Sequence, residues 1–160
     1  MFKWLWFSAA VILLDQITKQ IAEAILVLHQ PVPVLPSFNL TLMYNTGAAF
    51  SFLADAGGWQ RWFFLILSLS ISVVLLIWIG RLKSGENLMA AALSLILGGA
   101  AGNFIDRALL GHVVDFIQVY YAQWYWPAFN IADSAITVGA ALLIINSVFE
   151  VRHRSSKEST

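Results

Sequence analysis

The chain has 160 residues, a formal net charge of zero, 59% hydrophobic residues and 11% charged residues. Soluble domains average about 45–50% apolar and about 25% charged residues, so the composition excludes an ordinary soluble domain and indicates a single integral-membrane domain over residues 1–160. The zero net charge gives no reason to expect nucleic-acid binding. The absence of cysteine excludes disulfides, a thiol nucleophile and thiolate metal ligands.

Residues 4–28 form the first segment that is long enough to cross a bilayer, which takes about 20 residues. Asp15, Lys19 and Glu23 interrupt it at intervals of four residues, which predicts that all three lie on one face of a helix. We expect that face to point into a helix bundle rather than into lipid. The alternative is a cleavable signal peptide, since Lys3 precedes an 11-residue apolar run and Ala22–Glu23–Ala24 resembles a cleavage site. The charges within the segment argue against removal.

Residues 29–61 are expected to form a loop outside the bilayer, because three prolines near its start disfavour helix. Within this loop, residues 39–45 alternate polar and apolar side chains well enough to predict a short strand. The segment NTGAAFS, residues 45–51, follows. Its small residues permit a close approach of the backbone, and Asn45 can both donate and accept hydrogen bonds. Taken alone, this segment is equally typical of a tight turn.

Three further apolar segments predict membrane-spanning helices. They cover residues 62–80, 88–105 and 134–149, and a polar tail at 152–160 ends the chain. In the middle one, Gly98 and Gly102 form a GxxxG pattern, which lets two helices approach closely. The expected fold class is therefore an α-helical membrane protein with four transmembrane helices and a small extracytoplasmic region of strand and loop.

Basic residues are divided unevenly between the two ends of these helices. Arg61 and Arg107 lie at one end, and six lie at the other: Lys3, Arg81, Lys83, Arg152, Arg154 and Lys157. The positive-inside rule predicts that the end with six is cytoplasmic, as are both termini. Five aromatic residues at the opposite end are typical of an interfacial belt: Tyr120, Tyr121, Trp124, Tyr125 and Trp126.

Two carboxylates converge on the outer face in this topology, because Asp115 lies in an outer loop and Asp133 starts the last helix. Charge at a membrane border is costly unless it is paired, solvated or used. Two carboxylates in one site hold a single proton near neutral pH, since both cannot ionise cheaply. The ionised member could take a proton from water, and the protonated member could donate to the peptide bond under attack. Neither a metal nor a cofactor is required.

Each of these residues also has a purely structural interpretation. Asp133 could be a charge favoured by the helix dipole, and Asp115 could be a solvated loop acid. His112 among carboxylates suggests a metal site, but a single histidine is a poor ligand set for zinc, and an interfacial position fits it better. Asp106 could simply pair with its neighbour Arg107.

A small proton-coupled carrier is the alternative function. A proton relay would use the charged face of the first helix. Such a relay needs polar groups along its whole path, and the last three spans carry no ionisable residue in their cytoplasmic halves apart from Glu150 at the edge. The sequence therefore favours a site at one border over a path across the membrane.

Five blocks of the sequence stand out, and in chain order they are DQITK (15–19), NTGAAFS (45–51), GGAAGNFIDR (98–107), VVDF (113–116) and FNIAD (129–133). Together they resemble the lipoprotein signal peptidases, the type II signal peptidases of bacteria. Each block alone is weakly specific, but all five occur in order at the outer ends of the expected spans. The resemblance implies an aspartyl protease of the bacterial inner membrane. Such an enzyme removes signal peptides from diacylglyceryl-modified prolipoproteins and cleaves before the lipidated cysteine.

The same resemblance implies roles for individual residues. It places the catalytic pair on Asp115 and Asp133. Eight further residues are implied to shape the site or bind substrate: Asp15, Lys19, Asn45, Gly99, Asn103, Arg107, Asn130 and Ala132. The expected partners are the prolipoprotein substrate and membrane lipid, and we expect the chain to act as a monomer.

Overall fold

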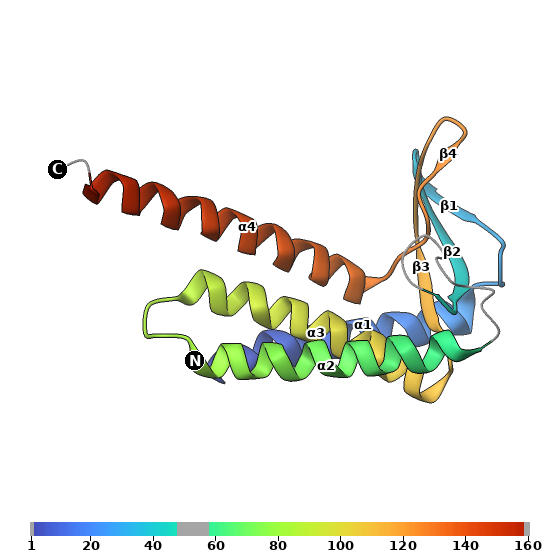
Figure 1. Cartoon of the computed structure of the whole chain (residues 1–160). Coiled ribbons are helices and arrows are strands. Elements are labelled where there is room, and N and C mark those ends of the chain that lie inside the picture. Colours follow the sequence, from blue (N-terminus) through green and yellow to red (C-terminus); the bar gives the residue numbers. More distant parts are fainter. Residues whose placement is uncertain (1, 48–57, 159–160) are drawn as a thin grey trace.

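The computed structural model describes residues 2–47 and 58–158. Its described part consists of four long helices and a small sheet at one end of them (Figure 1). A short 3-10 turn, η1 (Phe2–Trp4), precedes the helices α1 (Leu5–Ile25), α2 (Trp59–Arg81), α3 (Asn87–Leu109) and α4 (Ile131–Glu158). The strands are β1 (Val32–Leu35), β2 (Phe38–Asn45), β3 (Val113–Tyr121) and β4 (Trp124–Tyr125).

Three of these helices are long and apolar enough to cross a membrane: Trp59–Arg81, Asn87–Leu109 and Ile131–Phe149. The first helix, α1, does not belong to this group. Its buried face includes the charged residues Asp15 and Lys19, whereas many of its large apolar side chains are exposed. The fold is therefore mostly helical, with three long apolar helices and a small antiparallel sheet.

The charged face of α1 is only partly as predicted. Asp15 and Lys19 are buried against the other helices, as expected, but Glu23 is exposed. Each step of four residues turns about 40° beyond one full helical turn, so a face defined by Asp15 has rotated away two steps later. Ala22 takes the buried position at that level of the helix.

The central helix is α3, which packs against each of the other three. Gly98 and Gly102 face α1, where a Cβ on Gly98 would lie 2.8 Å from Val11 and one on Gly102 would lie 2.6 Å from Asp15. The close approach predicted from the GxxxG pattern is confirmed. Side chains at these two positions would push α1 outward and separate its charged residues from α3.

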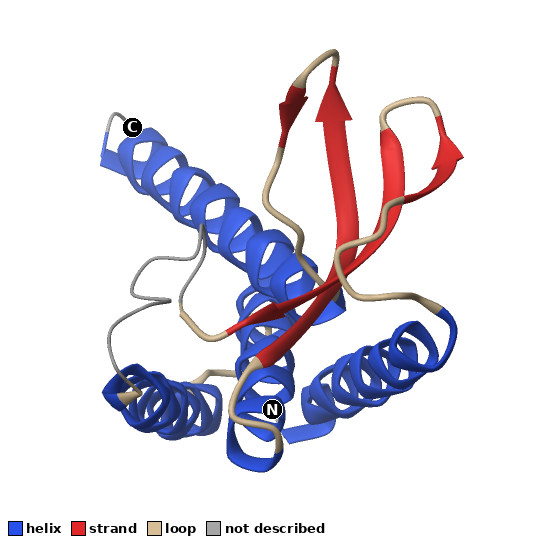
Figure 2. Cartoon of the chain, turned by 90° about the vertical axis from the view of Figure 1, so that its right-hand side faces the viewer, coloured by secondary structure: helices blue, strands red, loops and turns tan. Residues whose placement is uncertain are grey.

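The four strands form one antiparallel sheet in the order β1-β2-β3-β4. In Figure 2, where the helices are seen nearly end on, the sheet stands in front of one end of the helices. The strand predicted at residues 39–45 is confirmed as β2, and its pairing sets Met43 opposite Asp115 and Asn45 opposite Val113. The expectation that Asp115 lies in a loop was wrong, because β3 contains it. Its segment is rich in β-branched and aromatic residues, which favour strands.

Several boundaries differ from those expected. Helix α2 begins at Trp59, three residues before the expected span, and α1 ends at Ile25. Helix α4 continues to Glu158, so residues 152–158 of the predicted polar tail are helical. The second part of the NTGAAFS block, from residue 48 onward, lies outside the described residues.

Candidate active site

Asn130 joins the two aspartates that the sequence singled out. Its side-chain nitrogen donates a 2.7 Å hydrogen bond to Asp115 Oδ1, and its side-chain oxygen accepts a 2.9 Å hydrogen bond from Asp133 N. Asn130 is fully buried. Asn130 therefore links the carboxylate of Asp115 on β3 to the backbone of Asp133 on α4.

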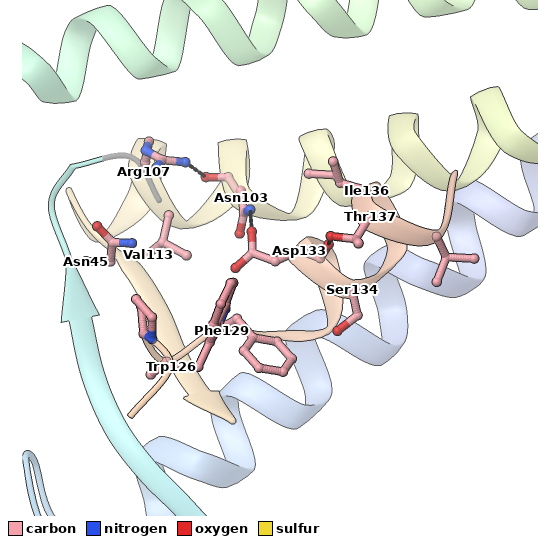
Figure 3. Close-up of a pocket in the computed structure, with 13 residues that line it drawn as sticks. Asn45, Asn103, Arg107, Val113, Trp126, Phe129, Asp133, Ser134, Ile136 and Thr137 are labelled. Carbon is pink, nitrogen blue, oxygen red and sulfur yellow. Dashed lines mark hydrogen bonds between the residues drawn. The ribbon is translucent and has the colours of Figure 1, made fainter. Parts of the chain in front are cut away.

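Asp133 occupies the first turn of α4, where the positive end of the helix dipole favours a negative charge. Asn103 Nδ2 donates a 2.8 Å hydrogen bond to Asp133 Oδ1 from the neighbouring helix α3 (Figure 3). The side chain is half-buried and lines a cavity. Asp133 therefore has a hydrogen-bond donor beside it and still borders the cavity.

Asp115 has a different environment on β3, where it is 2% exposed. It accepts hydrogen bonds from Asn130 at 2.7 Å and from Asn45 at 3.2 Å. Burial raises the pKa of Asp115 to about 7, and the negative charge of Asp133 adds to this increase. The two hydrogen bonds and the positive charge of Lys19 act in the opposite direction. The interpretation of Asp115 as a solvated loop acid is wrong.

A buried cluster of three charges lies next to the pair. Lys19 Nζ is 2.8 Å from Asp15 Oδ2 and 2.8 Å from Asp106 Oδ2, and it donates a 3.1 Å hydrogen bond to Asn103 Oδ1. All three charged side chains are 3% exposed or less. A pairing of Asp106 with Arg107 was one interpretation of the sequence. Asp106 pairs with Lys19 instead, because Arg107 points from α3 toward a different element.

Arg107 holds the segment that follows Asn45. Its Nη2 donates a 2.8 Å hydrogen bond to the carbonyl of Gly47, and its guanidinium lies 5.2 Å from the ring centroid of Phe64 on α2. Both Asn45 and Arg107 line the same cavity as Asp133 (Figure 3). The arginine therefore joins the end of β2 to α2 and α3 at the mouth of the site.

Gly99 and Ala132 allow α4 to begin close to α3. A Cβ on Gly99 would overlap the carbonyl oxygen of Ala132 and lie 2.7 Å from Ile136. Ala132 is fully buried, and its backbone N–H donates a 2.9 Å hydrogen bond to Asp15 Oδ1. These two small residues set the position of the helix turn that carries Asp133.

A cavity of about 600 Å³ lies beside Asp133, and Asn45, which donates to Asp115, also lines it. Its walls combine polar residues of the site with apolar side chains from the segment before α4 and from α4 itself (Figure 3). The lining residues are Asn45, Asn103, Arg107, Val113, Trp126, Pro127, Ala128, Phe129, Asp133, Ser134, Ile136, Thr137 and Val138. Such a mixed surface suits an extended peptide, whose backbone needs hydrogen bonds and whose side chains are apolar.

The sequence did not single out the cavity wall on α4. Thr137 lies four residues after Asp133 and therefore on the same helical face, so periodicity alone could have indicated it. Trp126 and Phe129 had no such signal, because their direction depends on how the segment between β4 and α4 returns to the sheet. Phe129 is placed by backbone hydrogen bonds to Ile117 on β3.

His112 packs against Tyr44, with 4.1 Å between their ring centroids, and burial lowers its pKa. Tyr44 in turn donates a 3.2 Å hydrogen bond to Glu23. In residues 2–47 and 58–158, no three His, Asp or Glu side chains are grouped in a way that could hold a metal ion. His112 is thus a packing residue beside the sheet in this structure.

Comparisons with known proteins agree on one family. The family model described as signal peptidase (SPase) II matches residues 7–149. A lipoprotein signal peptidase of Teredinibacter turnerae is 58% identical over 147 residues, which cover 92% of this chain and 88% of the relative. A lipoprotein signal peptidase of Pseudomonas aeruginosa is 54% identical over 145 residues, which cover 89% of this chain and 86% of the relative.

Two solved structures, both described as bacterial membrane enzymes, have a similar fold. One is 34% identical with a TM-score of 0.85, and the match covers 94% of this chain and 90% of the other. The second is 35% identical with a TM-score of 0.77, and the match covers 91% of this chain and 92% of the other. The similarity in fold thus extends over the helices and the sheet alike.

Proposed function

We propose that Asp115 and Asp133 are the catalytic pair of this chain, which belongs to the signal peptidase II family and removes signal peptides from prolipoproteins. The observation that carries the assignment is that Asn130 hydrogen-bonds both the carboxylate of Asp115 and the backbone N–H of Asp133. Family membership gives no support to the alternative of a proton-coupled carrier. The chain is a bacterial inner-membrane protease, and its aspartic mechanism is our proposal.

The two environments divide the chemical roles. Asp115 is the member that carries the shared proton, because its pKa is raised to about 7 by burial. Asp133 is the ionised member, since it lies at the start of α4 and receives the hydrogen bond from Asn103. Two carboxylates with different environments provide an acid and a base at the same pH.

The reaction is a two-step hydrolysis of a peptide bond. A water molecule attacks the carbonyl carbon, Asp133 takes one proton of that water, and Asp115 gives its proton to the carbonyl oxygen. In the second step, the carbon–nitrogen bond breaks as Asp133 returns its proton to the leaving amine. One hydroxyl proton of the tetrahedral intermediate passes back to Asp115, which restores the starting state. The cycle contains no step that needs a metal or a cofactor.

The substrate is a prolipoprotein whose cysteine carries a diacylglyceryl group, and cleavage takes place just before that cysteine. The cavity beside Asp133 supports this assignment, because polar groups of Asn45, Asn103 and Arg107 and apolar side chains of α4 line it together.

Six other residues are assigned supporting roles. Asn103, Asn130 and Asn45 orient the carboxylates, Arg107 holds the end of β2, and Gly99 and Ala132 set the start of α4.

The topology we propose has four membrane helices, with α1 as the fourth. The exposed face of α1 supports this, because it presents large apolar side chains to its surroundings: Trp6, Phe7, Leu13, Leu14, Ile17, Ile21 and Ile25. Both termini would then be cytoplasmic, and the sheet and the site would lie at the outer face. We further propose that the chain works as one domain and as a monomer.

A cleavage assay tests the catalytic pair. The purified protein and its Asp115→Asn and Asp133→Asn variants are incubated with a diacylglyceryl-modified prolipoprotein. Loss of one half of the acid–base cycle is expected to reduce kcat by about 10³-fold or more in each variant. Glu23→Gln serves as the control, because Glu23 is an exposed carboxylate of α1 that lies outside the buried site. Substantial turnover by either folded asparagine variant would disprove the assignment.

A further inference from the structure

Two buried carboxylates outside the proposed catalytic pair hold the backbone beside it. Asp15 Oδ1 accepts a 2.9 Å hydrogen bond from Ala132 N, and Asp106 Oδ2 accepts a 3.1 Å hydrogen bond from Val114 N. Each of these N–H groups belongs to the residue immediately before a proposed catalytic aspartate. The two contacts are thus equivalent, one on α4 and one on β3.

Lys19 connects the two carboxylates to each other. Its ammonium group is 2.8 Å from Asp15 Oδ2 and 2.8 Å from Asp106 Oδ2, and its third contact is Asn103 Oδ1 at 3.1 Å. An ammonium group has three donors, so all of them are used. A continuous chain of short contacts therefore runs from Val114 to Ala132 through three charged side chains.

Stability alone is a poor reason for this arrangement. One lysine and two aspartates leave a net charge of −1 in a buried place, and buried ion pairs often contribute little stability because desolvation offsets their attraction. Gln16 Nε2 donates a 2.8 Å hydrogen bond to Asp106 Oδ1 and a 3.3 Å hydrogen bond to Asp15 Oδ2, so it also links the two carboxylates. The arrangement does give a defined distance between two backbone segments.

We infer that Asp106 is a positioning residue, which, through Lys19 and Asp15, fixes β3 relative to the start of α4 and so sets the spacing of the catalytic carboxylates. This inference rests on the proposed catalytic pair. Asp106 itself is 3% exposed, and its contacts are the N–H of Val114, the ammonium group of Lys19 and the amide of Gln16, so it acts through these groups and not on the substrate.

The consequence is a specific pattern in the kinetics. Asp106→Asn keeps an oxygen that can accept from Val114 N–H but loses the ion pair with Lys19. Leucine in the Asp106→Leu variant has a similar size, but it removes both the hydrogen bond from Val114 N–H and the ion pair with Lys19. Misplacing a reacting group by about 1 Å can cost about 100-fold in rate, and removing a supporting hydrogen bond costs about 10- to 100-fold. We expect kcat to fall about 10-fold in Asp106→Asn and about 100-fold in Asp106→Leu, with KM changed by less than about twofold.

The experiment measures kcat and KM for the folded fraction of each variant, with a diacylglyceryl-modified precursor in detergent. Glu23→Gln is the matched control for removing an acidic side chain, and it is expected to match the wild type. A merely structural role would lower the melting temperature of both Asp106 variants and leave kcat per folded molecule unchanged. That result, or equal kcat values in the asparagine and leucine variants, would overturn the inference.

Two safeguards keep the result decisive. Should Asp106→Leu not fold, the nearly isosteric Asp106→Asn still tests the inference, because a wild-type kcat in that variant contradicts it. Asp115→Asn and Asp133→Asn are assayed in parallel. If those two are inactive while the Asp106 variants match the wild type, only the positioning role is wrong. If those two retain activity, the catalytic pair itself is wrong.

Discussion

The side-chain amide of Asn103 on α3 donates a 2.8 Å hydrogen bond to the carboxylate of Asp133 on α4. The orientation of this amide is fixed, because its oxygen accepts hydrogen bonds from Lys19 at 3.1 Å and from Asn130 at 3.3 Å. Rotating the amide by half a turn would place its N–H group against the N–H groups of Lys19 and Asn130. Asp133 consequently always faces an N–H group.

The first prediction replaces that donor by an acceptor. In Asn103→Asp, an oxygen faces Asp133 while the other oxygen can still accept from Lys19. We expect kcat to fall about 100-fold, since a second carboxylate beside Asp133 disfavours the ionised base. The measurement is kcat with lipid-modified precursor, and Asn146→Asp on the distant half of α4 is the control. An Asn103→Asp enzyme with wild-type kcat would contradict the assigned role of Asp133.

The second prediction concerns pH. Burial and the charge of Asp133 raise the pKa of Asp115 to about 7, and the proposed mechanism needs Asp115 protonated. The value of kcat/KM should therefore fall as pH rises above about 7, as Asp115 loses its proton. The hydrogen bond from Asn45 lowers this pKa, so Asn45→Ala should raise it and move the falling limb to higher pH. If the decrease of kcat/KM in Asn45→Ala begins at the same pH or at a lower pH, Asp115 is not the proton donor.

The sequence predicted those parts of the site that depend on local periodicity. Asp15 and Lys19 were placed on the buried face of α1 by their spacing, and Asp133 was placed at a helix start. Asp115 was misplaced in a loop, because a strand such as β3 is stabilised by pairing with β2, which lies far away in the chain. The residue types of β3 favour a strand, but no local pattern shows which distant segment it pairs with.

The ion-pair partner of Asp106 could not be predicted from the sequence for the same reason. Its neighbour in the sequence, Arg107, was the obvious partner, yet adjacent residues on a helix point in different directions. Asp106 shares a helical face with Asn103 and meets Lys19 on α1. A rule based on spacing of three or four residues would have joined Asp106 to Asn103, but not to a residue on another helix.

The third prediction tests the packing of α4 on α3. In Gly99→Ala, the new methyl group would overlap the carbonyl of Ala132 and displace the turn that carries Asp133. Overpacking of this kind costs about 1–3 kcal/mol of stability. We expect a lower melting temperature together with a lower kcat. Gly80→Ala is the matched control, because its nearest contact would be the ring of Phe2 at 3.4 Å. Equal effects of the two changes would argue against a special role of Gly99.

The fourth prediction concerns orientation, and it uses the absence of native cysteine. Tyr121→Cys introduces one thiol at an exposed position next to the β3–β4 turn, and Ser84→Cys introduces one in the turn between α2 and α3. A membrane-impermeant thiol reagent should label the first variant from outside the inner membrane, and the second only after the membrane is permeabilised. The reverse pattern would place the site on the cytoplasmic side and overturn the topology.

The fifth prediction concerns the lipid on the substrate. Two acyl chains hold a precursor in the membrane, at about 0.8 kcal/mol per buried methylene, and keep its cleavage site near the border where the site is proposed to lie. Restricting the substrate to that plane also removes part of the entropy cost of encounter. We therefore expect a much lower kcat/KM for the same precursor without its diacylglyceryl group. Detergent micelles make the test stringent, because both precursors then reach the enzyme in the same phase. Equal rates in micelles would mean that the lipid acts only as a membrane tether, and that the cavity beside Asp133 does not recognise it.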